Sequence, residues 1–442
     1  MRYIDSLNIK VDTECFILIE PGLGYLVHAL REKFKHSKII TLHIDKNFPQ
    51  AGDAVLYCTD PVSAQDFLEK EVPEIDASRI LIIEWRPSLN FYREAYVKLL
   101  SQVVEFIKRM DAGKRTVSAF GKRWVRNFFR NIGNVRETLL YNTMDIPVII
   151  TGSGPSLEEA IPVIKDIREK SLVIAASSSV MALSHGGIRA DIVIAADGGA
   201  WALRHIYPYF RNTSAAIAFA ANLCAALPSQ CGGVPWLIIN DGSLWQSVIL
   251  HELSLPSVII PQRGTVTAAA VELALILSGG NIYLAGMDLC VRDIRTHARP
   301  YGFDYLFFEN AGRISPAYSK CFTRSRQIQD GSSLDIYSAW FRKQLASWPE
   351  RIFSLGGNHE VFGNISATGY TGKETGKYFK AVPAGDDPAT FSKRGAAALL
   401  VALKDSRYTE SLKTELAPLL FPDKKEVTEH DLEKAISEAA YE

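Results

Sequence analysis

The segment from Pro147 to Leu157 carries residues whose types and spacing suit the binding of an anion. Its apolar part, Val148-Ile149-Ile150, predicts a buried parallel strand, because both faces of such a strand are covered. The small residues Gly152, Ser153, Gly154, Pro155 and Ser156 follow as a turn, and a helix is expected from there to Glu169. Glycines let backbone N–H groups approach a ligand, and a helix N-terminus favours phosphate. The same residues would also suit a strand-to-helix turn that binds nothing.

Polar side chains stand at the ends of other strands expected in this region. Ser177 and Ser178 follow the apolar run Leu172–Ala176, and Asp197 follows the run Asp191–Ala196. Met287 and Asp288 stand near the end of a later run that begins at Asn281. Regular alternation of strands and helices indicates a parallel sheet with helices on both faces, and ligands bind at the carboxyl ends of its strands. Either aspartate could bind ribose hydroxyls or a metal, or cap the helix that follows it.

His297 is the best candidate for acid–base chemistry. It lies in a polar segment with Thr296 and Arg299, and its ordinary pKa near neutrality suits proton transfer. The chain has nine histidines, so an ordinary exposed loop histidine is the alternative. Gly264, Thr265 and Val266 precede an Ala/Leu-rich helix and could form a second anion contact or a plain helix cap. No HExxH metal spacing, GxSxG elbow or Walker lysine occurs, which argues against a metal site, a serine hydrolase and a P-loop enzyme.

The elements before Pro147 divide into two parts. Strands at Cys15–Glu20 and Ile39–Asp45, separated by a Pro-Gly-Leu-Gly turn and a helix, have the order of half a Rossmann fold. Asp45 stands where a ribose contact could fall, yet only two glycines of the longer fingerprint are present, so a nucleotide-binding fold without a ligand is favoured here. Helical periodicity then dominates from Asn90 to Asn142. The basic and aromatic residues at 123–131 fit a helical connector better than an RNA-binding patch.

Composition places limits on the function. The chain has 442 residues, enough for several domains, and 49 basic residues balance 49 acidic ones, so nucleic-acid or anionic-membrane binding has no support. The six cysteines form no CxxC pair and favour reduced, buried thiols. The N-terminus does not read as a signal peptide, and no apolar run is long enough to span a bilayer, so a cytoplasmic protein is expected.

The ordered blocks of motifs resemble the motility accessory factor (Maf) family of flagellin glycosyltransferases. The resemblance is carried by Val148–Leu157, Ile174–Ser179, Ala190–Asp197, the segment from Gly264 to Asp288, and Thr296-His297-Ala298. The Pro21–Tyr25 turn and Trp124, Asn127 and Asn131 of the connector also fit. The expected fold is α/β, with a Rossmann-like domain (1–112), a helical connector (113–144), a central doubly wound, sialyltransferase-like domain (145–312) and a mostly helical C-terminal domain (313–442).

The resemblance implies a chemistry as well as a fold. The donor would be a CMP-activated nonulosonic acid of the pseudaminic, legionaminic or sialic type. The acceptors would be serine or threonine hydroxyls of flagellin in the cytoplasm, and no metal cofactor would be required. The Gly152–Ser156 turn would hold the nucleotide, with Ser177, Ser178, Asp197, Met287 and Asp288 beside it. Gly264 to Val266 would help to hold the donor, and His297 would be the general base.

Two positions differ from the family pattern, and another family shares the first motif. Related sequences often have Gln-Asp where this chain has Met287-Asp288, and the glycine expected before Thr296 is absent. The first motif also resembles MptE-like pterin pyrophosphokinases, which use magnesium and ATP, and in which Asp197 and Asp288 would bind metal. A third possibility is a flagellin-binding assembly factor without catalysis. The sequence does not indicate an oligomeric state.

Overall fold

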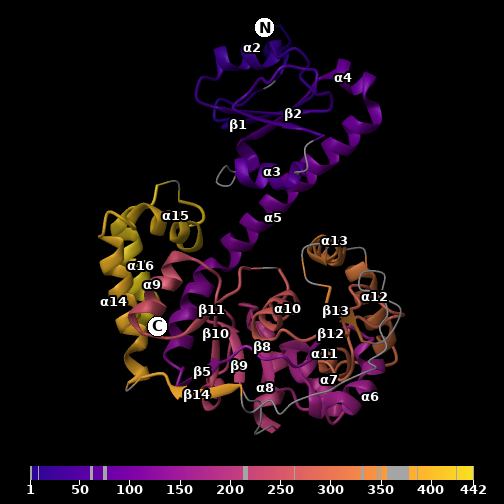
Figure 1. Cartoon of the computed structure of the whole chain (residues 1–442), viewed down its shortest axis with the longest axis vertical. Helices are drawn as coiled ribbons and strands as arrows, with labels where there is room; N and C mark the ends of the chain where they lie inside the picture. The colour runs from indigo at the N-terminus through magenta and orange to yellow at the C-terminus, as the bar shows by residue number, and fades with distance from the viewer. Residues whose placement is uncertain are drawn as a thin grey trace. The chain divides into compact units, whose positions relative to one another are not determined.

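The computed structural model of the chain describes residues 2–7, 9–59, 63–72, 77–212, 218–262, 264–329, 333–345, 348, 350–355, 378–385, 387–424 and 426–441. The chain forms two compact units, which we call unit 1 (Met1–Ala119) and unit 2 (Phe120–Glu442). The boundary falls inside one long helix, α5 (Arg93–Ile132) (Figure 1). None of the described helices is both long and apolar enough to cross a membrane.

Unit 1 is built on a four-stranded parallel sheet in the order β3-β2-β1-β4. The strands are β1 (Cys15–Ile19), β2 (Lys38–His43), β3 (Ala54–Tyr57) and β4 (Ile80–Glu84). The helices are α1 (Arg2–Ser6), α2 (Tyr25–Lys33), α3 (Ala64–Glu71), α4 (Arg86–Phe91) and the first part of α5. The predicted Rossmann-like order of strand, glycine turn, helix and strand is confirmed.

Strand β1 shows why this sheet needs helices on both sides. Its side chains are all apolar, and successive side chains of a strand point to opposite faces. Cys15, Ile17 and Ile19 belong to a hydrophobic cluster that includes α3 and α5. Phe16 and Leu18 belong to a second cluster that includes α1 and α2.

Unit 2 is built on a ten-stranded sheet in the order β13-β12-β6-β7-β8-β9-β10-β5-β14, with β11 also paired to β10. All pairs are parallel except that of β5 with β14. The strands are β5 (Glu137–Tyr141), β6 (Val148–Thr151), β7 (Leu172–Ala176), β8 (Ile192–Ala195), β9 (Ala218–Asn222), β10 (Trp236–Asn240), β11 (Ser257–Ile259), β12 (Ile282–Ala285), β13 (Ile352–Ser354) and β14 (Phe379–Pro383). The predicted central parallel sheet is confirmed.

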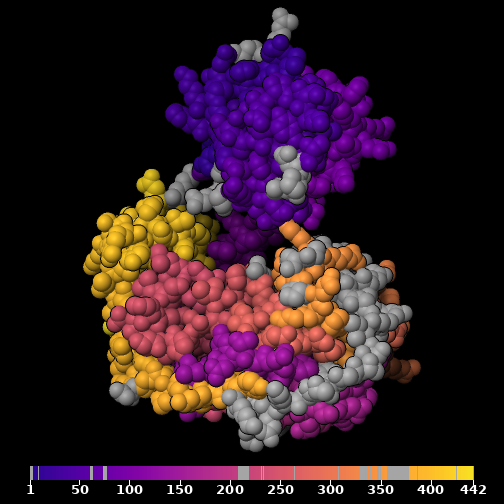
Figure 2. Space-filling view, in the orientation of Figure 1, coloured from indigo at the N-terminus to yellow at the C-terminus, as the bar shows by residue number. Residues whose placement is uncertain are grey.

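Helices cover both faces of this sheet. They are α6 (Leu157–Ile167), α7 (Val180–His185), α8 (Leu203–Asn212), α9 (Leu244–Glu252), α10 (Val266–Leu277), α11 (Asp304–Phe308), α12 (Ala317–Gln329), α13 (Ser333–Leu345), α14 (Phe391–Leu403), α15 (Thr409–Leu420) and α16 (Glu429–Tyr441). Val148 and Ile150 of β6 pack in a cluster with α10, whereas Ile149 packs in a cluster with α5 and α6. The C-terminal residues, yellow in the space-filling view, lie against α9, because α14 packs on that helix (Figure 2).

Three features of unit 2 differ from the sequence-based picture. The helical stretch expected to reach Asn142 ends with α5 at Ile132, and the β-prone Glu137–Tyr141 forms β5. The C-terminal region is helical as predicted, but it also contributes β13 and β14 to the central sheet. The six cysteines form no disulfide, as expected, although Cys58 and Cys290 are exposed rather than buried.

Candidate active site

The C-terminal edge of the unit 2 sheet collects most of the residues selected from the sequence. Strand β6 lies between β12 and β7, so the chain order reverses there, and ligands of open α/β sheets bind at such switch points. The turn Gly152–Ser156 follows β6, Ser177 and Ser178 follow β7, and Asp197 follows β8. Met287 and Asp288 follow β12. Because these four strands are neighbours, their ends line one continuous stretch of the edge.

Two amides of the Gly152–Ser156 turn donate hydrogen bonds to the last residue of β12 and to the residue after it. The N–H groups of Gly152 and Gly154 donate to the carbonyls of Ala285 (2.8 Å) and Gly286 (2.7 Å). A Cβ on Gly152 would lie 2.5 Å from the Gly286 carbonyl oxygen, so a larger residue could not approach so closely. Among the described residues, Ser153 is the one member of this turn whose N–H has no acceptor, since Pro155 lacks an N–H.

Asp288 occupies the N-terminus of α6. Its Oδ2 accepts hydrogen bonds from the Ser156 N–H (3.0 Å) and from the Ser156 hydroxyl (2.8 Å). A Cβ on Gly154 would overlap this carboxylate. Helix N-termini favour anions, and here the protein supplies its own. A phosphate could therefore reach the Ser156 amide only by displacing Asp288, so the turn is not the open cradle that the sequence suggested.

The segment after Asp288 is fastened to the first turn of α6. Arg292 pairs with Glu159 (3.0 Å) and lies 3.8 Å from Asp288, and Arg295 pairs with Glu158 (3.0 Å). The Ala298 N–H donates to the Ser153 carbonyl (2.8 Å). The chain around the predicted base is thereby held against the glycine turn, although it lacks the glycine expected before Thr296.

His297 is half-buried in this segment. Its Nδ1 lies 2.8 Å from Thr296 Oγ1, and its ring stacks on Tyr301 with centroids 3.9 Å apart and planes 12° from parallel. Burial, with a smaller contribution from the charge of Arg324, lowers the pKa of His297 to about 3. The imidazole is therefore neutral at pH 7. A pKa this low also makes it a weak base, so proton transfer to it requires the pKa to rise when substrates bind. The adjoining cavity measures about 20 Å³, which is room for about one water molecule.

His205 and Tyr301 join this group, and neither was selected from the sequence as a site residue. The His205 ring, on α8, lies 4.9 Å from the Tyr301 ring. Burial lowers the pKa of His205 to about 4, although the charge of Asp197 acts in the opposite direction. A Cβ on Gly302 would lie 2.7 Å from His205 Nδ1, so a glycine is needed for this approach. In the sequence, the glycine between the aromatic residues Tyr301 and Phe303, close to His297, was the feature that could have indicated this close contact.

Helix α5 supports the segments after β8 and β9. The Asn127 side chain donates to the carbonyls of Gly198 (3.3 Å) and Cys224 (3.0 Å). The Asn131 side chain donates to those of Leu223 (2.7 Å) and Ala225 (2.8 Å). Both asparagines are buried in an otherwise apolar helix face. Two polar residues four positions apart on such a face indicate in the sequence that their side chains bind other parts of the protein.

The remaining predicted residues have structural partners. Asp197 accepts the Gly199 N–H (2.7 Å) and so stabilises its own turn. Thr265 caps α10, because its hydroxyl accepts the Ala268 N–H (3.0 Å), and Gly264 adopts a positive φ of 75° before it. Met287 is buried in the cluster around α10. Within the described residues, no group of three or more His, Cys, Asp or Glu side chains is placed to hold a metal ion.

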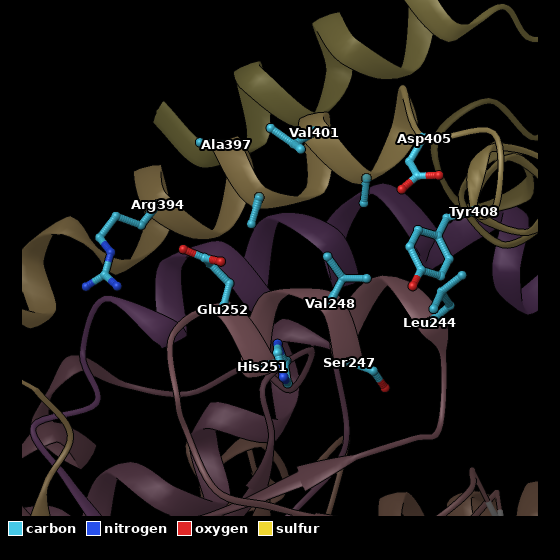
Figure 3. A pocket seen from close by; sticks show the side chains of 12 residues that line it. Leu244, Ser247, Val248, His251, Glu252, Arg394, Ala397, Val401, Asp405 and Tyr408 are labelled. Carbon is cyan, nitrogen blue, oxygen red and sulfur yellow. The ribbon is translucent and has the colours of Figure 1, made fainter.

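A separate groove of about 730 Å³ lies between α9 and α14 (Figure 3). Val248 and Val401 line it from the two helices, with Arg394 and Glu252 toward one end and Asp405 and Tyr408 toward the other. None of the residues selected from the sequence lines this groove, so it is distinct from the sheet edge described above.

The first comparison with known proteins concerns the central part of the chain. Residues 122–293, which include β6, the glycine turn and Asp288, match the family described as "6-hydroxymethylpterin diphosphokinase MptE-like". The match covers the part of unit 2 where the strand ends gather, and it agrees with the similarity noted for the first motif.

Two further similarities extend over most of the chain. The solved structure of a MAf glycosyltransferase from Magnetospirillum magneticum AMB-1 aligns with 96% of this chain and 73% of its own length, with a TM-score of 0.51 and 14% identity. The resemblance to the Maf family is thereby confirmed at the level of the fold. An uncharacterized protein of Treponema pallidum (strain Nichols) is 25% identical over 349 residues, which are 79% of this chain and 75% of that protein.

Proposed function

We propose that this protein is a glycosyltransferase that moves a nonulosonic acid from its CMP-activated form to serine or threonine hydroxyls of flagellin in the cytoplasm. One observation carries the proposal. The segment that contains His297, a neutral histidine, is held against the Gly152–Ser156 turn by a hydrogen bond from the Ala298 N–H to the Ser153 carbonyl. The fold shared with a MAf glycosyltransferase along nearly the whole chain supports the same assignment.

In the proposed reaction His297 takes the proton of the acceptor hydroxyl. The hydroxyl oxygen then bonds to the anomeric carbon of the sugar, while the bond from that carbon to the phosphate oxygen breaks and CMP leaves with the electron pair. The base must be His297 Nε2, because Nδ1 faces Thr296 Oγ1. If Nδ1 carries the hydrogen and donates it to that hydroxyl, Nε2 keeps its lone pair for the acceptor.

The donor would lie along the ends of β6, β7 and β8. The Ser153 N–H is available to a phosphate oxygen in the Gly152–Ser156 turn, and Ser178 and Asp197 lie further along the same edge. Binding at the Ser156 amide would require Asp288 to turn away, and Arg292, 3.8 Å from it, offers an alternative partner. Backbone donors that stabilise a leaving phosphate provide electrostatic catalysis without a metal.

The family match over residues 122–293 favours one alternative, a magnesium- and ATP-dependent pterin pyrophosphokinase. In that reaction Asp197 and Asp288 would have to bind the metal. Both carboxylates accept backbone N–H groups in the structure, at Gly199 and Ser156, and would have to leave them.

Calorimetry with CMP and with Mg-ATP separates the two enzymes. We expect CMP to bind and Mg-ATP to give no comparable heat, and transfer to flagellin to persist in EDTA. Tight Mg-ATP binding without a response to CMP would contradict the proposal.

Intact-mass measurement of flagellin co-expressed with the nonulosonate pathway tests the base. The chain with His297→Ala should leave flagellin without the sugar mass that the unchanged protein adds. His251→Ala, on α9 beside the separate groove, is the matched control and should add the full mass. An unchanged glycan mass with His297→Ala would remove this histidine from the mechanism.

A further inference from the structure

Arg204 lies over two aromatic rings beside the candidate active site. Its guanidinium carbon lies 5.3 Å from the ring centroid of Trp201 and 4.7 Å from that of Tyr305. Arg204 is itself exposed, as are Trp201 (60%) and Tyr305 (37%), so the group lies at the surface. Stacking on rings restrains a guanidinium and leaves its N–H edge free to bind a planar anion.

Arg204 has no carboxylate partner within the part of the chain that the structure describes. The acidic side chains of the neighbouring segments are engaged with backbone amides: Asp197 accepts the Gly199 N–H, and Asp304 accepts the Tyr301 N–H (2.8 Å). Arg407 offers a contrast, since it lies over Tyr408 but is bound to Asp405 (2.6 Å). A restrained arginine without an internal counterion is suited to an external one.

The arginine is connected to His297 through a continuous set of rings. His205, the next residue, lies 4.9 Å from Tyr301, and Tyr301 is stacked on His297. Phe303 lies 6.0 Å from Trp201 and 5.5 Å from Tyr301. His297 and the rings of Trp201, Tyr301 and Phe303 therefore belong to one contiguous aromatic cluster, which Arg204 joins through Trp201.

We propose that Trp201, Arg204 and Tyr305 form a binding site for a carboxylate of the reacting substrates. A guanidinium presents paired N–H groups that match the two oxygens of a carboxylate, and flanking rings suit the apolar groups next to it. This proposal rests on the proposed function, in which two substrates carry carboxylates: the nonulosonic acid, and acidic side chains of the acceptor polypeptide.

A thermodynamic cycle tests the site on the donor side. Calorimetry compares CMP with CMP-N-acetylneuraminic acid, which carries a carboxylate, for the unchanged chain and for Arg204→Ala. If the donor supplies the carboxylate, Arg204→Ala weakens binding of the CMP-sugar about tenfold and leaves CMP binding unchanged. Arg394→Ala is the matched control, because Arg394 also lies over an aromatic ring, Phe391, away from the sheet edge. It should change neither affinity.

The acceptor arm uses transfer to flagellin at saturating CMP-sugar. If the acceptor supplies the carboxylate, Arg204→Ala raises the KM for flagellin about tenfold with little change in kcat, and Arg204→Lys restores part of the loss. Unchanged donor affinity together with an unchanged flagellin KM would overturn the proposal, as would an equal loss of CMP and CMP-sugar binding. Failure of the unchanged chain to bind CMP or to transfer sugar would instead reject the proposed function.

Discussion

The sheet of each unit has an edge formed by the carboxyl ends of its parallel strands. Each unit places a buried carboxylate at this edge, but in a different way. In unit 1, Glu20 follows β1; its Oε2 accepts the N–H groups of Ile44 (2.7 Å) and Asp45 (3.0 Å), and Oε1 lies 3.1 Å from His43 Nδ1. In unit 2, Asp288 follows β12 and binds Ser156 at the start of α6. One carboxylate stabilises the end of a neighbouring strand, and the other fills a helix N-terminus.

This difference determines what each edge offers to a ligand. Helix α2 begins at Tyr25, and its N-cap residue, Gly24, provides no side-chain cap. The nearby Glu20 carboxylate instead accepts backbone N–H groups just after β2. Helix α6 is capped by Asp288, at the place where a phosphate would gain from the helix dipole. An anionic ligand must therefore compete with Asp288 in unit 2, whereas Glu20 does not occupy the start of α2.

Replacing the unit 1 carboxylate should have the largest effect on stability. Glu20→Ala removes the acceptor for two backbone N–H groups and leaves His43 without its partner, so we expect a loss of about 3–5 kcal/mol. Hydrogen exchange followed by mass spectrometry should show faster exchange in β1 and β2, with unit 2 unchanged. Glu32→Ala, an exposed glutamate on α2, is the control. Unchanged protection in β2 would show that Glu20 does not hold this edge together.

A methyl group added to each turn tests how closely the two edges are packed. In unit 2, Gly154→Ala would overlap Asp288 and place the new atom 2.8 Å from the Gly286 carbonyl, so we expect about 3 kcal/mol of destabilisation. In unit 1, Gly22→Ala meets nothing within 4 Å and costs only the strain of a positive φ of 66°, about 1 kcal/mol. Urea unfolding with local exchange rates measures both. Equal losses of stability in the two variants would contradict the conclusion that the unit 2 turn is closely packed and the unit 1 turn is open.

The positions of these strand ends could be predicted from sequence, but their hydrogen-bond partners could not. Val148-Ile149-Ile150 followed by two glycines marks a buried strand and a tight turn whatever the rest of the chain does. The acceptor for the Ser156 N–H is Asp288, 132 residues later, and a carboxylate at a strand end reads equally as a ligand contact or a helix cap. Only the strand order β12-β6-β7 decides between these readings.

The side chains that surround His297 could not be predicted from the sequence for a similar reason. Its stacking on Tyr301 joins residues four apart in an irregular segment, where no periodicity indicates which side chains meet. The contact of Tyr301 with His205 also joins that segment to α8, about a hundred residues earlier. Asn127 and Asn131 were named from the sequence only for the family resemblance, although polar residues on an apolar helix face require internal partners.

Removing the charge of Asp288 tests whether this carboxylate competes with an anionic ligand, and it should lower the stability of unit 2 only moderately. Asp288→Asn keeps an acceptor for Ser156 but loses the attraction of a full negative charge to the start of α6, about 1 kcal/mol. Because a donor phosphate would no longer be repelled, we expect CMP to bind several-fold more tightly, as measured by calorimetry. Glu20→Gln in unit 1 is the control and should leave CMP affinity unaltered. Weaker CMP binding with Asp288→Asn would show that this carboxylate assists the nucleotide instead of competing with it.

The last comparison is a pH dependence specific to unit 2. Burial lowers the pKa of His205 to about 4 and that of His297 to about 3, whereas both titrate near 6.5 in the unfolded chain. Between about pH 6.5 and pH 3 the unfolded state therefore binds more protons than the folded state, so unit 2 loses stability as the pH falls through that window. At pH 5 this linkage amounts to about 2 kcal/mol for each histidine, up to about 4 kcal/mol for the two together. Urea unfolding of the double variant His205→Phe, His297→Phe should show a flatter profile, with unit 1 as the internal reference. An equally steep profile in that variant would mean that the acid sensitivity of unit 2 originates elsewhere.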